Sequence, residues 1–514
     1  MPVAVSYPGV YIQEAPSSVH TITGVATSIA VFVGWANQGP TTPQLVLSFS
    51  DYQRTFGGLY QGALLGYSVS QFFGNGGSQA YIIRLTDGSA VPAATSSVSA
   101  GTASIVFSAA TLGAANPGLW GNNYGILIKN QSGATGRFRV QVVYNPPGAP
   151  TPTVVESFEN LSMNSPDTQG RYLVDILNAQ SNFVTATVTT PMTPPATAPA
   201  DITAPLMMVK GTDGVVLTPN TAAFETALAS ANGYTQLAHV DLFNLLCVPG
   251  ETTPSVISNL ETFCVAHRAF MIVDCAATDT FSSLQTANGP NSNITGTPGT
   301  NAAFYFPWIN APDPLNQGGT GPFPPCGYVA GVYAATDGSR GVWKAPAGTA
   351  TSLSGINGPA VNLNDAENGF LNPVAVNCIR TFSAYGTVVW GARTLQGNDE
   401  IGSQWKYVPV RRLALYIEES LYRGTQWAVF EPNDEPLWSA LRLNIGSFMQ
   451  TLFRQGAFQG QTPQDAYFVK CDDETTTQSD INLGIVNVIV GFAPLLPAEF
   501  VVITIQQMAG QTGS

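Results

Sequence analysis

Apolar residues near the N-terminus follow the spacing of buried strands separated by a helix. Residues 27–40, TSIAVFVGWANQGP, read as a strand closed by a Gly-Pro turn, and residues 78–88, SQAYIIRLTDG, read as a second strand closed by Asp-Gly. Between them, residues 52–73 have apolar positions spaced as in a helix. The pattern therefore predicts a β-α-β unit in this part of the chain.

The pattern of the middle of the chain predicts further alternation of helix and strand. Short apolar runs with few charges are typical of strands covered on both faces. The predicted helices are 220–231 and 255–268, and the predicted strands are 241–250, 269–275 and 302–309. Together with the first β-α-β unit, these elements predict a mixed α/β central domain.

Two amphipathic helices are predicted in the last third of the chain. The first covers 411–424, and the second covers 433–456, where Asp434 is the expected cap and Pro436 stands in the first turn. A glycine ends each helix. Their apolar stripes are Leu413, Tyr416, Ile417 and Leu421 in the first helix, and Leu437, Leu441, Ile445, Phe448 and Leu452 in the second. Strands are predicted to follow at 466–472, 484–494 and 499–507.

The amino-acid composition changes between about 90 and 208, where runs of Ala, Ser, Thr and Pro are frequent. A disordered linker is disfavoured because residues 124–130 and 137–145 alternate as good strands do. The tripeptide Thr-Asp-Gly stands at 86–88 and again at 212–214, as if the chain left one domain and returned to it. The region is therefore predicted to be an inserted β-rich domain.

The composition excludes several classes of protein. Charged residues make up 10% of the 514 residues, well below the roughly 25% of ordinary soluble domains, which favours a surface covered by other subunits over a thermostable or extracellular β-protein. A net charge of −13 with scattered Lys and Arg disfavours nucleic acid as a partner.

The start of the chain lacks the pattern of a signal peptide, and no apolar run is long enough to span a membrane. We therefore expect synthesis and folding in a cytoplasm without membrane anchoring. The six cysteines show no C-x-x-C pair and read as buried thiols.

Motifs for catalysis, metal binding or nucleotide binding are missing from the sequence. The three histidines, His20, His239 and His267, have no metal-ligand spacing. None of the five lysines stands in a phosphate-binding loop, and the adjacent carboxylates at 418–419 and 472–474 are better explained as solvated faces. We therefore expect no enzyme activity, no catalytic residues, no metal and no cofactor.

Several long segments resemble contractile tail sheath proteins, which occur in phage tails and in phage-derived injection particles. The N-terminal segment YPGVYIQEAPSSVHTITGVATSIAVFVGWANQGP carries the resemblance, and so does VRRLALYIEESLYRGTQWAVFEPNDEPLW at 410–438. Further matching segments, in the order of the family, are 72–85, 324–348 and 371–395. The resemblance covers about 1–90 and 210–510, whereas the insertion falls where sheath proteins vary.

The resemblance implies an α+β, multidomain fold with strand-donating terminal arms. The implied domains are an N-terminal arm at 1–22, a central α/β domain at 23–89 and 209–360, an inserted outer domain at 90–208, a C-terminal helix-plus-sheet domain lining the inner tube at 361–498, and a C-terminal arm at 499–514. Each arm would add a strand to a sheet of a neighbouring subunit. The residues expected to make these contacts are Val3, Val5, Tyr7, Val10, Ile12, Val501, Ile503 and Ile505.

The function implied by the resemblance is that of a structural subunit. Copies would form stacked six-membered rings around an inner tube, and contraction would drive the tube through a cell envelope. The implied partners are further copies of the chain, the inner tube protein, and the baseplate and tail terminator proteins. Assembly is expected in the cytoplasm of a bacterial host, and a phage virion and a dedicated injection particle both remain open.

The distribution of charge suggests which residues face the tube. Residues 380–454 carry eight Lys and Arg against seven Asp and Glu, whereas residues 1–379 carry ten against nineteen. A less acidic inner wall could meet an acidic tube, and Arg442 and Arg454 lie off the apolar stripe of their helix. They are the expected tube contacts, with a solvated helix face as the alternative. A β-rich, glycan-binding surface protein is the alternative function, supported by the Thr, Ser and Asn of the insertion.

Overall fold

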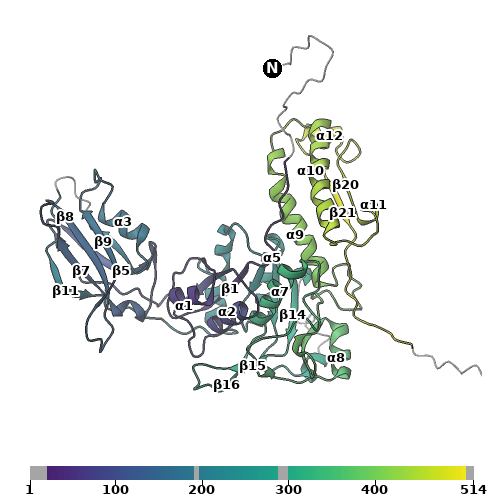
Figure 1. Ribbon diagram of the computed structural model, residues 1–514, viewed down its shortest axis with the longest axis horizontal. Coiled ribbons are helices and arrows are strands. Elements are labelled where there is room, and N and C mark those ends of the chain that lie inside the picture. The colour runs from purple at the N-terminus through teal and green to yellow at the C-terminus, as the bar shows by residue number, and fades with distance from the viewer. Residues whose placement is uncertain (1–19, 190–195, 287–298, 505–514) are drawn as a thin grey trace, which may run out of the picture. The chain divides into compact units, whose positions relative to one another are not determined.

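The computed structural model describes residues 20–189, 196–286 and 299–504 (Figure 1). The chain forms two compact units. Among the described residues, one comprises those within 27–339 and 345–408, and the other comprises 20–26, 340–344 and 409–504. Each unit has a hydrophobic core of its own.

The first unit is built on an eight-stranded sheet. Its order is β19-β18-β14-β13-β12-β1-β3-β2, and the strands from β18 to β3 run parallel, with antiparallel β19 and β2 at the edges. The strands are β1 (Ala30–Trp35), β2 (Gln44–Val46), β3 (Ala80–Leu85), β12 (Leu245–Cys247), β13 (Phe270–Asp274), β14 (Ala302–Phe306), β18 (Val376–Phe382) and β19 (Gly386–Val389). This sheet confirms the predicted mixed helix-and-sheet fold and the β-α-β unit.

Helices cover both faces of this sheet. The ring of Phe32 lies 5.4 Å from that of Phe72 in α2 (Leu64–Gly74), whereas Val31 packs with α4 (Ala222–Ala229) and α5 (Pro254–Ala266). Since successive side chains of a strand point to opposite faces, both faces are buried, which explains the continuous apolar runs. The other helices here are α1 (Phe49–Phe56), α6 (Phe281–Thr286), α7 (Cys326–Arg340) and α8 (Asp365–Leu371), and a small sheet contains β15 (Ile309–Pro312), β16 (Thr320–Phe323) and β17 (Gly358–Pro359).

The single helix predicted at 52–73 is wrong. The structure has α1 and α2 instead, separated at Gly57 and Gly58, whose φ angles are 86° and 83°. These left-handed conformations are accessible to glycine and end the first helix. The apolar spacing on each side of the break is helical, so the pattern found the helices but not the interruption.

The inserted region is β-rich and has a hydrophobic core of its own. One four-stranded sheet contains β4 (Val98–Ala100), β5 (Ala103–Thr111), β6 (Ala114–Ala115) and β10 (Val184–Val188). The other has the order β11-β7-β8-β9, from β7 (Tyr124–Asn130), β8 (Arg137–Tyr144), β9 (Thr153–Ser162) and β11 (Ile202–Met207). With α3 (Leu173–Gln180), they enclose a cluster of buried residues that includes Phe107, Phe138 and Leu177.

The second unit contains two long helices and a two-stranded sheet. Leu413, Ile417 and Ile445 lie in its core, in agreement with the predicted apolar stripes. The elements are α9 (Val408–Gly424), α10 (Glu435–Arg454), α11 (Pro463–Ala466), β20 (Tyr467–Lys470), α12 (Gln478–Asn482) and β21 (Ile489–Phe492). The predicted strands at 466–472 and 484–494 are therefore present in shorter form, whereas residues 501–504 of the strand predicted at 499–507 have no regular structure.

The C-terminal unit begins later than the predicted boundary at 361. Strands β18 and β19 lie beyond that boundary, but Phe304 of β14 pairs with Val376 of β18, which places both strands in the eight-stranded sheet. The unit that contains α9 and α10 begins at Pro409. The predicted boundary was too early because β14 and β18 pair over a long distance in the sequence, and such a pairing produces no local sequence pattern.

Candidate assembly surfaces

The described end of the chain is an exposed apolar segment. From Thr477 to residue 504 no described residue is buried. Phe500, Val501, Val502 and Ile503 are exposed, and Val502 has 88% of its surface open to solvent. Such a run leaves apolar side chains and backbone groups unpartnered in the isolated chain, so it favours association with another surface.

The sheet of the C-terminal unit contains two strands, β20 and β21. Tyr467 pairs with Phe492 and Lys470 with Ile489 in an antiparallel ladder. Within the described parts of the chain, no further strand joins this sheet. Its residues Phe468 and Ile489 are exposed. Edges of this kind can accept an extended segment by strand addition.

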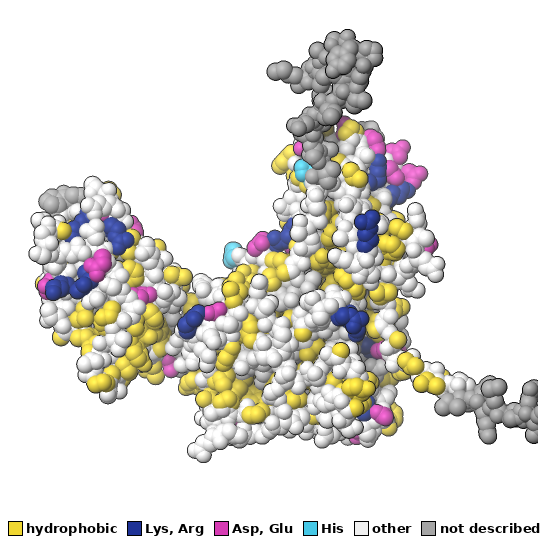
Figure 2. All heavy atoms as spheres, viewed as in Figure 1, with side chains coloured by type: hydrophobic (Ala, Val, Ile, Leu, Met, Phe, Trp, Pro, Cys, Tyr) yellow, Lys and Arg dark blue, Asp and Glu magenta, His cyan; other side chains and the backbone are white. Residues whose placement is uncertain are grey.

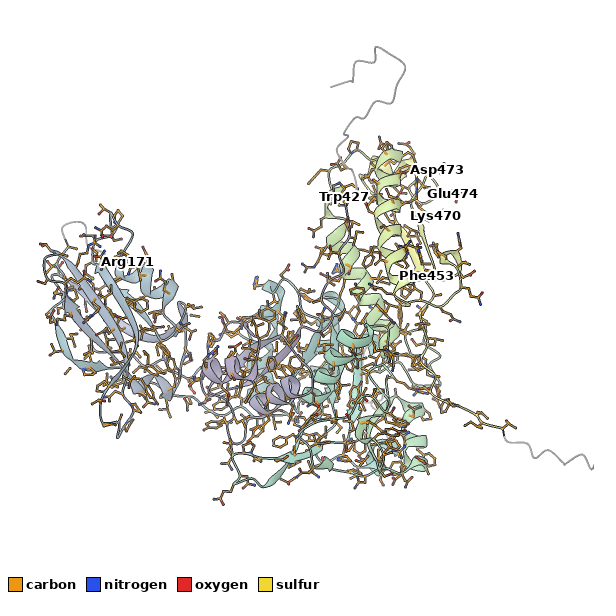
Figure 3. The ribbon with its side chains drawn as sticks, viewed as in Figure 1. Arg171, Trp427, Phe453, Lys470, Asp473 and Glu474 are labelled. Atoms are coloured by element: carbon orange, nitrogen blue, oxygen red, sulfur yellow. The ribbon has the colours of Figure 1, made fainter. Side chains whose placement is uncertain are left out.

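The N-terminal segment that is described lies along α9. Ile22 is buried in the core of the C-terminal unit, the backbone N–H of Val25 donates to the Ser420 hydroxyl at 3.2 Å, and the His20 ring stacks on Trp427 at 4.2 Å. Figure 3 labels Trp427 at the end of the helix pair where this segment lies. The described segment therefore reaches Trp427 at residue 20.

The predicted arm residues are placed only in part. Val3, Val5, Tyr7, Val10, Ile12 and Ile505 lie outside the described residues. Val501 and Ile503 lie in the exposed C-terminal segment, where their side chains face solvent. Their contacts with a neighbouring subunit stay a prediction.

The two predicted tube contacts differ in their surroundings. The Arg442 guanidinium donates to the Glu435 carboxylate and to the Cys471 carbonyl oxygen, both in its own unit. Arg454 is exposed in the last turn of α10. Arg454 is therefore the freer cation of the two, and the role of either in binding a tube stays a prediction.

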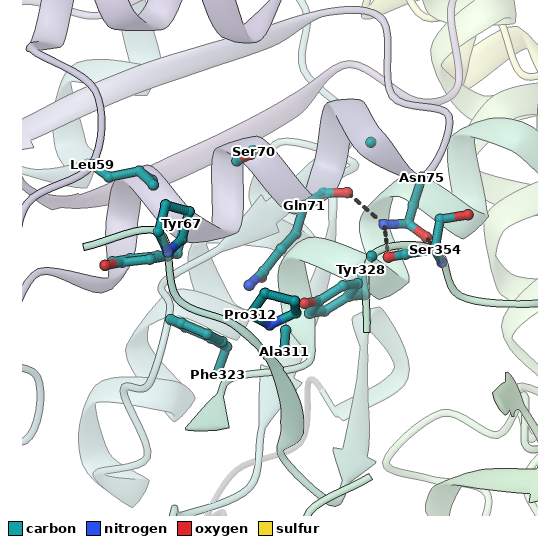
Figure 4. A pocket seen from close by; sticks show the side chains of 13 residues that line it. Leu59, Tyr67, Ser70, Gln71, Asn75, Ala311, Pro312, Phe323, Tyr328 and Ser354 are labelled. Atoms are coloured by element: carbon teal, nitrogen blue, oxygen red, sulfur yellow. Dashed lines mark hydrogen bonds between the residues drawn. The ribbon is translucent and has the colours of Figure 1, made fainter. Parts of the chain in front are cut away.

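A cavity of about 220 Å³ lies in the first unit between α2 and the β15–β16 hairpin (Figure 4). Its wall includes the rings of Tyr67, Phe323 and Tyr328 together with Pro312. Gln71 reaches into it from α2, and Asn75 is held by hydrogen bonds to the carbonyl oxygens of residues 71 and 354. None of the residues that line it is Asp, Glu, His, Cys, Lys or Arg, so the cavity offers no charged acid–base pair.

Arg84 joins the central sheet to the insertion. It lies fully buried in β3, and its guanidinium donates to the carbonyl oxygens of Ala36, Gly39 and Pro117, each at 2.7 Å. Burial lowers its pKa to about 10, so it remains charged at neutral pH. Asn116 completes the junction, since its side-chain oxygen accepts the N–H of Gly39 at 2.7 Å.

Charged side chains are sparse on the visible face, where most of the surface is polar or apolar (Figure 2). No group of three or more His, Cys, Asp or Glu suited to a metal ion occurs among residues 20–189, 196–286 and 299–504. In the same ranges, no helix has the length and apolar character needed to cross a membrane.

Two family models match the chain in the order expected for a tail sheath. The phage tail sheath protein central domain matches residues 227–395, and the phage tail sheath C-terminal domain matches residues 400–508. This chain belongs to the contractile tail sheath family. Neither match includes the insertion, and the two matches meet between 395 and 400, close to the start of the second unit of this sheath chain.

Curated relatives support the sheath assignment. A tail sheath protein of Vibrio phage KVP40 is 28% identical over 130 residues, which are 25% of this chain and 19% of that protein. A prophage major tail sheath protein of Pseudomonas aeruginosa (strain UCBPP-PA14) is 26% identical over 180 residues, which are 34% of this chain and 44% of that protein. The match thus spans about a fifth of the first relative and less than half of the second.

Solved sheath structures share the fold over nearly the whole chain. The sheath of an extracellular contractile injection system, PVC, in its contracted state has a TM-score of 0.59 and 24% identity, with 98% of this chain and 99% of that chain covered. The contracted helical sheath of the anti-feeding prophage has a TM-score of 0.56 and 22% identity, with 98% and 100% covered. A sheath tail protein of Listeria innocua has a TM-score of 0.58 and 13% identity, with 92% and 96% covered.

Two features of this sheath protein were missed by the sequence analysis. One is the Arg84 junction, which a lone arginine in the apolar strand AYIIRL could have indicated. The other is the loop between α9 and α10, where the apolar run WAVF at 427–430 stands in a connection that is normally polar.

Proposed function

We propose that this chain polymerises as stacked six-membered rings around an inner tube and contracts to drive that tube through a target cell envelope. Membership of the sheath family supports this proposal, as does a fold shared with sheaths in the contracted state. Membership of this family also favours the role of a structural subunit over that of a glycan-binding surface protein.

The observation that carries the proposal is that one chain contains both a candidate donor strand and a candidate acceptor sheet. The exposed segment at 500–503 is apolar and unpaired, while the sheet of β20 and β21 has no third strand in the described chain. Strand addition would form about five backbone hydrogen bonds of roughly 0.5–1.5 kcal/mol each. Burial of each Val or Ile would add about 1.5–3 kcal/mol, before the entropy lost on ordering the arm.

In the proposed assembly, the terminal arms stay paired while the bodies of the subunits change their packing. Contraction is then a rigid-body transition between two packings of the same subunits, released by a baseplate trigger. The energy comes from the better packing of the contracted rings. Baseplate, tail terminator and inner tube proteins are the proposed partners, and assembly takes place in the cytoplasm of a bacterial host.

Electron microscopy of the purified full-length chain tests the proposal. We expect tubes of indefinite length with ring striations, and we expect a chain that ends at residue 499 to remain monomeric with unchanged circular dichroism. Size-exclusion chromatography separates this outcome from a glycan-binding protein, which would give a small oligomer of fixed size. A full-length chain that forms only such an oligomer would contradict the proposal.

A further inference from the structure

The loop between α9 and α10 presents an aromatic side chain to solvent. Phe430 is fully exposed to solvent, and the preceding Val429 is 62% exposed. A fully exposed Phe next to an exposed Val is unusual on a soluble chain, because burying such side chains is a major source of binding free energy.

The loop is held in place. The N–H of Val429 donates to the Gln426 carbonyl oxygen at 3.2 Å, and the N–H of Glu431 donates to the Ala428 carbonyl oxygen at 3.2 Å. Asn433 then links the loop to the chain after α12, because its amide nitrogen donates to the Ile485 carbonyl oxygen at 2.9 Å. The exposed side chains are therefore carried on a structured loop.

The backbone at Phe430 is strained. Its φ is +69°, in the left-handed region that bulky side chains rarely adopt. A strained residue persists only where its surroundings fix it, and such residues cluster at functional sites. The Phe430 ring contributes no buried surface to its own unit, so no packing within the monomer compensates for this strain.

A second segment extends the apolar surface around Phe430. Trp427 and Ala428 pack on the same small core as Ile481 and Val486, which brings the turn after α12 to this end of the unit. That turn exposes Leu483, at 72%, and Ile485. We call Val429, Phe430, Leu483 and Ile485 the α9–α10 patch.

The N-terminal segment leads to this patch. Going toward the N-terminus, Val25 lies at Ser420, Gly24 lies against Tyr416, Ile22 lies against Gly424, and His20 stacks on Trp427. The segment therefore runs toward the C-terminal end of α9.

We infer that the α9–α10 patch docks on an apolar surface of a second copy of this chain, namely the copy that receives the N-terminal arm. The inference rests on the proposed function, in which residues 1–15 reach a neighbouring subunit. Because residues 20–25 run along α9 toward Trp427, we expect that neighbour to lie next to Val429 and Phe430. The arm and the patch would then form one continuous contact.

Phe430→Gly is the decisive variant, because glycine relieves the positive φ while it removes the ring. We expect its melting temperature to equal or exceed that of the wild type, and the concentration needed for tube formation to rise roughly 10- to 100-fold, as expected for the loss of one buried Phe. Leu112→Gly is the matched control, because Leu112 in the insertion is also exposed, at 56%, with a positive φ of 45°. Tubes of Phe430→Gly that form at the wild-type concentration would overturn the inference.

A photo-crosslinking amino acid at position 430 identifies the occupant. In wild-type-like tubes we expect a crosslinked dimer of the chain, detected by mass spectrometry of the joined peptides. A crosslink to the tube protein alone, or none in intact tubes, would overturn the inference and leave the proposed function standing. A wild-type chain that forms no tubes would overturn both.

Discussion

Arg84 of strand β3 donates a hydrogen bond of 2.7 Å to the carbonyl oxygen of Pro117, and this bond joins the central sheet to the insertion. The same guanidinium also binds carbonyl oxygens that follow β1. A single buried cation thus satisfies backbone acceptors from two folds. Arg84 stabilises the fold through the acceptors that it satisfies, because a buried carbonyl oxygen without a donor lowers the free energy of unfolding.

Arg84→Met should strongly destabilise the chain. The substitution keeps most of the aliphatic volume but leaves several buried carbonyl oxygens without a donor, which we expect to lower the free energy of unfolding by about 3–5 kcal/mol. Urea denaturation measures the change. Arg54→Met is the control, because Arg54 is exposed and its ion-pair partner in the described chain is Asp51, so its loss should change stability by less than about 1 kcal/mol. Equal stability of the two variants would contradict this role of Arg84.

Removal of the insertion should leave polymerisation intact. Val91 and Thr212 exchange backbone hydrogen bonds of 3.0 Å, so the two ends of the insertion lie side by side. We expect a chain that joins residue 88 to residue 212 through a short linker to form tubes, with the insertion missing from their outer surface in electron micrographs. A shortened chain that folds by circular dichroism yet makes no tubes would show that the insertion takes part in assembly.

Glu261 is a buried carboxyl group without a hydrogen-bond partner in the described chain. Burial raises its pKa to about 8 in the folded protein, compared with about 4.5 when unfolded. The folded state therefore holds a proton that the unfolded state releases in this range, and stability falls as the pH rises from about 4.5 to 8. Above pH 8 the folded state also loses the proton, so this decline levels off.

Glu261→Met should remove that decline and increase the free energy of unfolding at pH 7 by about 3 kcal/mol. This figure follows because pH 7 lies roughly 2.5 pH units above the unfolded pKa, and each unit corresponds to about 1.4 kcal/mol. Urea denaturation at pH 5.5 and 7.5 measures it. Glu251→Met is the matched control, because the Glu251 carboxylate is equally buried but accepts the N–H groups of Asn220 and Thr253. That change should destabilise the chain, and a Glu261→Met variant that behaves in the same way would refute the prediction.

Removal of residues 1–15 should abolish tubes and leave a folded monomer. The described N-terminal segment is anchored from His20 onward, so we expect the core of its own unit to form without the arm. Val5→Asp combined with Ile12→Asp should have the same effect, because charge on the buried face of an added strand costs several kcal/mol, roughly 2–7 for each polar group without a partner. Electron microscopy beside circular dichroism distinguishes lost assembly from lost folding.

Arg454→Glu is the cleaner test of tube binding. Arg454 is exposed, whereas Arg442→Glu would place a carboxylate beside Glu435 and the Cys471 carbonyl oxygen and should lower the melting temperature. We expect Arg454→Glu to give sheaths that assemble without a tube, detected by co-sedimentation with the tube protein. Unchanged tube binding would rule out Arg454 as a contact.

The local spacing of apolar residues was sufficient to predict the helices and strands whose buried face can be recognised within a few residues. The stripe through Leu413 and Ile417 predicted α9, and the apolar run at 30–35 predicted β1. The break at Gly57 was missed because glycine in the middle of an amphipathic pattern is tolerated in many helices, and only the backbone angle shows that it ends one here.

Long-range features could not be predicted from one chain. The pairing of Phe304 with Val376 places β18 and β19 in the central sheet, and these partners are 72 positions apart in the sequence. Phe430 escaped notice for a different reason, since exposure depends on the surrounding fold. The predicted arm residues before 20 lie outside the described chain, so their contacts await the experiments on assembly.

The adjacent ends of the insertion make it an exchangeable module. Because the chain enters at Val91 and leaves at Thr212 through one hydrogen-bonded pair, a domain of different size and origin can be grafted there while these two residues keep their positions. In the proposed assembly, a change of this domain would leave the strand order of the central sheet unaltered. The same site offers an engineer a place to display a foreign domain in a regular array.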